Sequence, residues 1–160
     1  MTEAPPARVQ TRLAVRSDID ALVALMRAFY AESGHRLDSR WAAASFADLL
    51  GEPALGAAWI ATVATGAVGH AVLTVRHAME FGGLAGCIDD LYVLPAWRRR
   101  GVAAALLAAA RSECERRGCK AWQVEVGRDN AAARALYRRC GLAPVEGDRV
   151  TLAAVLPPAS

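Results

Sequence analysis

The spacing of apolar residues changes between a helical period and a strand period along the chain, and the order of these changes limits the folds that it can adopt. Apolar residues that recur three and four positions apart predict helices, and short apolar or alternating runs bounded by turn residues predict strands. The helical stretches are residues 19–30, 37–51, 102–117 and 130–140. The strand stretches are residues 13–15, 57–64, 67–77, 82–94, 121–126, 142–145 and 149–156.

Turn and breaker residues between these stretches indicate how they connect. Thr65 and Gly66 separate two strand stretches, which predicts a hairpin. Pro95 ends the next strand stretch because proline has no backbone donor. The order of elements predicts one α/β domain with a mixed sheet over residues 11–160, preceded by a loose N-terminus at residues 1–10. A chain of 160 residues is long enough for one such domain.

Composition argues against several classes of protein. With 54% hydrophobic and 22% charged residues, the chain has the makeup of a soluble globular protein. A net charge of +3 is too small to imply nucleic-acid binding by itself, and no apolar run reaches the roughly 18 residues of a membrane-spanning helix. The first ten residues lack the apolar core of a signal peptide, so we expect a cytoplasmic protein. The four cysteines form no C-x-x-C pair and have no histidine at zinc-ligand spacing, which argues against a metal site.

The segment RRRGVA, at residues 98–103, follows a strand stretch and opens a helical one. A helix start presents unpaired N–H groups and a partial positive charge, which together favour a phosphate group. Gly101 and Ala103 leave room for an anion near the backbone, and Arg98 and Arg100 can add charge-assisted hydrogen bonds. Taken alone, the pattern also fits a solvated basic helix start.

A second segment, DNAAARALYRRCGL at residues 129–142, places three residues on one helix face. Asn130, Ala133 and Tyr137 stand at i, i+3 and i+7, so the aromatic hydroxyl lies about two turns from the capping amide. Residues 87–142, which hold both segments, closely resemble the GNAT superfamily of N-acetyltransferases. Members carry [Q/R]-x-x-G-x-[G/A] after the fourth strand and N-x-x-A-x-x-L-Y-x-x-x-G-[F/L] downstream.

The resemblance implies a fold and a cosubstrate. The fold would be a GNAT-type mixed, mostly antiparallel central sheet of about seven strands flanked by four helices, and the cosubstrate would be acetyl-coenzyme A (acetyl-CoA), with no metal. Main-chain amides of about residues 99–103 would hold the diphosphate, and Leu91 to Val93 would pair with the pantetheine arm and the acetyl carbonyl. Arg99 stands where many members carry glycine. The matched cofactor-binding positions are Leu91, Tyr92, Val93, Arg98, Arg99, Arg100, Gly101, Val102, Ala103, Asn130 and Tyr137.

Acetyl transfer to an amine needs a base for the ammonium group and an acid for the leaving thiolate. Tyr137 matches the tyrosine that protonates the thiolate in the family. The stretch IDDLYV resembles diamine and polyamine acetyltransferases, which favours Asp89 as the base and Asp90 as a substrate contact. Adjacent strand residues point to opposite faces, so only one of the two is expected to face a given site. Cys87 and Cys140 raise an acetyl-cysteine alternative, but neither has a histidine base beside it in sequence, so direct transfer in a ternary complex is favoured.

The acceptor is the part that the sequence determines least. Glu32, His35 and Asp38, together with the two strand aspartates, can attract a cation, so a small polyamine-like primary amine is the first expectation. Glu125 on the following strand is a further acidic candidate. A protein amino terminus or lysine, an aminoglycoside and an amino acid stay open. A non-catalytic acetyl-CoA sensor is one rival hypothesis, and the presence of Tyr137 favours an enzyme over it. A nucleic-acid module built on the arginines is another, but several of these arginines stand at predicted helix ends, where cations are ordinarily favourable. We therefore expect neither nucleic acid nor membrane as a partner. The resemblance is compatible with a homodimer and specifies no interface.

Overall fold

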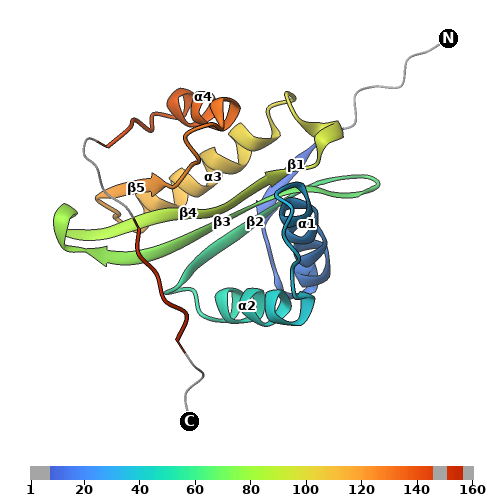
Figure 1. Cartoon of the computed structure of the whole chain (residues 1–160), viewed down its shortest axis with the longest axis horizontal. Helices are drawn as coiled ribbons and strands as arrows, with labels where there is room; N and C mark the ends of the chain where they lie inside the picture. Colours follow the sequence, from blue (N-terminus) through green and yellow to red (C-terminus); the bar gives the residue numbers. More distant parts are fainter. Residues whose placement is uncertain (1–7, 146–150, 157–160) are drawn as a thin grey trace.

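Five strands form one sheet with helices on both faces in this computed structural model, which describes residues 8–145 and 151–156 (Figure 1). The strands are β1 (Gln10–Leu13), β2 (Gly56–Val63), β3 (Gly66–Ala78), β4 (Gly83–Val93) and β5 (Ala121–Val124). The α-helices are α1 (Ile19–Glu32), α2 (Ser39–Gly51), α3 (Val102–Arg116) and α4 (Ala131–Arg139). Short 3-10 turns cover Arg16–Asp18, Met79–Phe81 and Pro95–Trp97.

The strands lie in the sheet in chain order. Neighbours from β1 to β4 run antiparallel. Short connections reverse the chain between β2, β3 and β4, whereas α1 and α2 connect β1 to β2. β4 and β5 run parallel, because α3 carries the chain back between them. The predicted mixed, mostly antiparallel sheet and its four helices are therefore confirmed.

The predicted final strand pair is wrong in the part of the chain that the structure describes. Residues 142–145 and 151–156 contain no strand. The sheet of the described residues therefore has five strands, where about seven were expected. Alternating apolar residues favour extended backbone, but a strand also requires a partner, and Leu152 and Val155 are exposed. Residues 146–150 of the predicted turn and last strand, and residues 1–7 of the predicted loose N-terminus, lie outside the described residues.

The first strand begins earlier than the apolar run suggests. β1 starts at Gln10, because its backbone pairs with β2 from Gln10 opposite Thr62 to Leu13 opposite Trp59. Beyond β1 the chain turns into α1, and the carboxylate of Asp18 accepts a hydrogen bond from the Val15 amide at 2.8 Å.

Apolar side chains of the sheet pack into two separate cores. One core joins the sheet to α3 and α4, and the other joins it to α1 and α2 (Figure 1). Alternation along β2 and β3 divides the strand residues between them. The α3 side receives Trp59, Ala61, Ala71 and Leu73, and the α1 side receives Ala58, Ile60 and Val72. No helix among the described residues has both the length and the apolar character needed to cross a membrane.

A bulge interrupts β4 at the position of the two adjacent aspartates. Val72 of β3 pairs with Asp90 and Leu73 pairs with Ile88, so Asp89 is the extra residue. Pairing between β4 and β5 ends at the same point, with Ile88 opposite Val124. Among the described residues, the stretch of β4 beyond Ile88 has no strand partner on its β5 side, so an opening forms between the two strands.

Candidate active site

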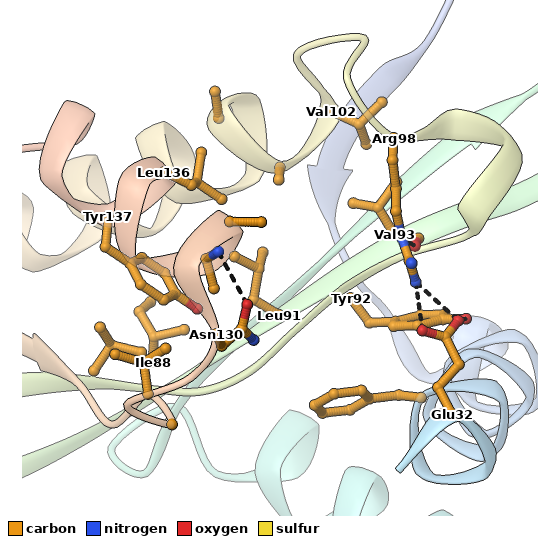
Figure 2. Close-up of a pocket in the computed structure, with 18 of the residues that line it drawn as sticks. Glu32, Ile88, Leu91, Tyr92, Val93, Arg98, Val102, Asn130, Leu136 and Tyr137 are labelled. Carbon is orange, nitrogen blue, oxygen red and sulfur yellow. Dashed lines mark hydrogen bonds and ion pairs between the residues drawn. The ribbon is translucent and has the colours of Figure 1, made fainter.

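A cleft of about 730 Å³ occupies this opening between β4, β5, the start of α3 and the inner face of α4. Figure 2 shows its lining residues, with Tyr137, Leu136 and Asn130 on one side and Val93, Arg98 and Glu32 on the other. The cleft brings together most of the residues singled out in the sequence. These are Glu32, Asp89, Leu91, Tyr92, Val93, Arg98, Arg99, Gly101, Val102, Ala103, Glu125, Asn130 and Tyr137.

The loop before α3 contains two residues with left-handed backbone. Gly101 is the N-cap of α3 at φ 80°, and Arg99 also takes a left-handed conformation, at φ 60°. Left-handed residues close to a helix start let successive amides converge on one point, where they favour an anion. Among the described residues, Arg99 is the only one other than glycine with positive φ. Glycine suits this position because it adopts positive φ without steric cost.

The guanidinium of Arg98 is fixed by hydrogen bonds to two other residues of the protein. Its Nε donates to the Val93 carbonyl at 2.9 Å, and its terminal nitrogen donates to both carboxylate oxygens of Glu32, at 2.7 and 2.8 Å (Figure 2). The Tyr92 hydroxyl donates to the same carboxylate at 2.6 Å. These bonds lower the pKa of Glu32, first through Arg98 and then through Tyr92. Arg98 and Glu32 therefore connect the loop before α3 to the end of α1.

Two other arginines have places that the sequence did not predict. The Arg100 guanidinium lies over the Trp97 ring, 5.1 Å from its centre, and Arg100 does not line the cleft. Arg139, at the end of α4, does line it and was not predicted as a site residue. Its spacing from Asn130 does not match the i, i+3, i+7 face, so only the three-dimensional structure shows that it reaches the cleft.

Asn130 and Tyr137 lie at opposite ends of α4. The Asn130 side-chain oxygen accepts a hydrogen bond from the Ala133 amide at 3.1 Å, which makes Asn130 the N-cap of the helix (Figure 2). Tyr137 is buried among the residues that pack between α4 and the sheet, and its hydroxyl points toward β4 (Figure 2). Burial raises the pKa of Tyr137, so its hydroxyl keeps its proton near neutral pH.

The bulge changes how the two aspartates are presented. Strict alternation would send them to opposite faces, but both line a second cavity of about 270 Å³ beneath α1 and α2, so that expectation is wrong. Asp89 also lines the main cleft, and it therefore stands where the two spaces meet. Desolvation raises the pKa of Asp89, and the nearby charge of Asp90 adds to the effect, while a hydrogen bond with Thr74 opposes it. Tyr30 and Trp41 contribute aromatic rings to the second cavity.

His35 and Asp38, which were expected to attract the acceptor, lie between α1 and α2 and contribute less than expected. His35 is exposed and lines neither cavity. Asp38 is the N-cap of α2, and its carboxylate accepts from the amides of Arg40 and Trp41 at 2.9 and 3.2 Å.

Cys87 is half-buried, and burial raises its pKa to about 11, so the thiol is protonated at neutral pH and a poor nucleophile. The described residues contain no group of three or more metal-ligating side chains.

Comparisons with known proteins agree with this geometry. A profile of the acetyltransferase (GNAT) family matches residues 20–142. An aminoglycoside N(6')-acetyltransferase type 1 from Stenotrophomonas maltophilia is 33% identical over 95 residues, which is 57% of this chain and 62% of that protein. The match thus spans less than two thirds of that relative.

Solved structures share the whole fold. An integron cassette protein from the mobile metagenome of Cole Harbour Salt Marsh is 37% identical, with a TM-score of 0.81 over 94% of this chain and 92% of its own. An aminoglycoside N-acetyltransferase solved in complex with CoA is 21% identical, with a TM-score of 0.79 over 96% of this chain and 98% of its own, and shows likeness of fold. Because the family profile covers most of the chain, this protein belongs to the acetyltransferase (GNAT) family.

Proposed function

We propose that the enzyme transfers an acetyl group from acetyl-CoA directly to a cationic primary amine. The observation that carries this proposal is the position of Asp89, which lines both the main cleft and the acidic second cavity. A thioester in the cleft and an amine in the second cavity would meet at this residue. The remaining side chains of the two cavities match the separate needs of the two substrates.

The main cleft fits acetyl-CoA. Arg99 and Gly101 have left-handed backbone, lie just before α3 and line the cleft, so main-chain amides at this helix start suit a diphosphate. Beyond Ile88, β4 has backbone groups that β5 does not pair among the described residues, and these suit the amides of a pantetheine arm. Capping engages the side-chain oxygen of Asn130 and leaves its N–H groups to donate to the same arm. When bound, acetyl-CoA supplies an activated acyl group.

Two side chains supply the proton transfers. Tyr137 holds a proton on its hydroxyl inside the cleft, where a departing thiolate needs one. Asp89, which lines both cavities and whose pKa is raised by desolvation, is the base toward an ammonium group, acting directly or through one water. The raised pKa favours proton uptake by the carboxylate, because it narrows the gap to the pKa of the amine.

The second cavity suits a cationic acceptor. Asp89 and Asp90 provide negative charge, and the rings of Tyr30 and Trp41 provide faces that attract cations. A small polyamine-like amine has the charge and width for such a space. An aminoglycoside is the second candidate, because it also carries several ammonium groups and the Stenotrophomonas relative is an aminoglycoside acetyltransferase.

The test is thiol release from acetyl-CoA with a panel of amines at neutral pH. The panel contains putrescine, spermidine, the aminoglycoside neamine, lysine and a peptide with a free amino terminus, and mass spectrometry of the products confirms N-acetylation. We expect turnover with spermidine or neamine above that with lysine or the peptide. Binding of acetyl-CoA without turnover on any amine would favour the sensor and contradict the proposal.

A further inference from the structure

His70 is a polar side chain that lies fully buried in the core of the described residues. It lies in β3 with no exposed surface, and neither ring nitrogen has a hydrogen-bond partner among those residues. An unpartnered polar group in a core destabilises the fold, so native proteins bury very few of them. An apolar side chain would fill the same space without that cost, which indicates that the ring nitrogens have another use.

The ring of His70 stands directly behind Asp90. Its Nε2 lies 3.7 Å from the Asp90 carboxylate, slightly beyond hydrogen-bond length. Phe46 of α2 and Tyr92 of β4 flank the ring, with centres 6.3 and 6.4 Å away. The aromatic neighbours thus restrict the ring on two sides, and its Nε2 edge faces the carboxylate.

Asp90 stands between His70 and the second cavity. The Asp90 side chain is only 15% exposed, and Asp90 lines the cavity together with Asp89 and Tyr30. The bulge at Asp89 is what brings both carboxylates to this face. A carboxylate at the wall of a small cavity needs a donor behind it if it is to keep one orientation, because its rotation is otherwise free on the open side.

We infer that His70 is a positioning residue, whose Nε2–H donates to the Asp90 carboxylate and directs it at the ammonium group of the acceptor. The inference rests on the proposed function, and it adds a specific role to a side chain that the family motifs do not include. A shift of less than 1 Å closes the 3.7 Å gap to a charge-assisted hydrogen bond. His70 does not contact the acceptor itself, since it has no exposed surface.

The test compares His70→Gln with His70→Met, two unbranched side chains of similar size of which only glutamine can donate a hydrogen bond. We expect His70→Met to raise the KM for spermidine about tenfold, or for neamine if spermidine is not acetylated, with the KM for acetyl-CoA within about twofold. His70→Gln should keep the acceptor KM within about threefold of the parent value. If His70→Met does not fold, His70→Leu takes its place.

A double-mutant cycle separates positioning from packing. In an Asp90→Asn background, His70→Met should change the acceptor KM by less than about twofold, because the orientation of a charged carboxylate is already lost. Equal effects of His70→Gln and His70→Met, or additive effects of the His70 and Asp90 changes, would overturn the inference while the enzyme itself stays active. An inactive parent enzyme would instead overturn the proposed function, and the acceptor role of His70 with it.

Discussion

Gly101 and Gly118 stand at the two ends of α3 and form a matched pair for testing the cofactor site. Gly101 has φ 80° and Gly118 has φ 71°, and at each position a Cβ atom would meet no heavy atom within 4 Å. Alanine in place of either glycine therefore carries the same conformational strain, about 1 kcal/mol, and no clash. Gly101 lines the cleft and Gly118 does not.

The two substitutions should differ only where acetyl-CoA binds. Both Gly101→Ala and Gly118→Ala should lower the free energy of unfolding by about 1 kcal/mol in urea denaturation. The methyl group of Gly101→Ala would occupy open space at a residue that lines the cleft, in the turn proposed to hold the diphosphate, so the Kd for acetyl-CoA should rise at least about tenfold, or about 1.4 kcal/mol. Gly118→Ala should leave it unchanged in isothermal titration calorimetry. Equal acetyl-CoA affinity of both variants would refute the assignment of the loop before α3 to the diphosphate.

Three further outcomes are expected. Tyr137→Phe keeps the buried ring and removes the proton donor, so kcat should fall by about 10² to 10⁴ with unchanged thermal stability, and an unchanged kcat would exclude the acid role. Glu32→Gln should cost about 1 kcal/mol of stability at pH 7, since the pair with Arg98 is partly exposed. Because the pKa of Glu32 is lowered in the folded protein, the stability difference between Glu32→Gln and the parent is present above the ordinary pKa of glutamate. It should vanish as the pH falls through the pKa of Glu32 in the folded protein. A stability difference in urea denaturation that does not change with pH would contradict this ion pair. Arg99→Gly should relieve a left-handed residue without loss of stability, whereas Arg99→Val should destabilise; equal melting temperatures would argue against the strained turn.

The period of the apolar residues predicted the layers of the fold but not its local irregularities. Ile19 to Tyr30 and the hairpin at Thr65 and Gly66 were identified because side-chain spacing follows directly from helix and strand geometry. The bulge at Asp89 was not, because it depends on how β3 pairs with β4. That single extra residue decides which face both aspartates occupy, so the acceptor side of the site could not be read from alternation.

Most of the residues that motif spacing predicted for the cofactor lie in one cleft, because their placement depends on local backbone. A capping residue was expected at the start of the helix that contains Tyr137, and the hydrogen bond that the Ala133 amide donates identifies it as Asn130. The roles of long side chains were harder to predict. Arg98 was expected at a phosphate and is held by Glu32, 66 residues away in sequence, a contact that only the packing of α1 against β4 creates.

A crystal structure with bound acetyl-CoA would test most directly how the cleft is used. We predict that the diphosphate lies against the main-chain amides of residues 99–103 and that the acetyl group lies between Tyr137 and Asp89. A diphosphate bound elsewhere, or an acetyl group remote from both side chains, would contradict the proposed site and the direct transfer that depends on it.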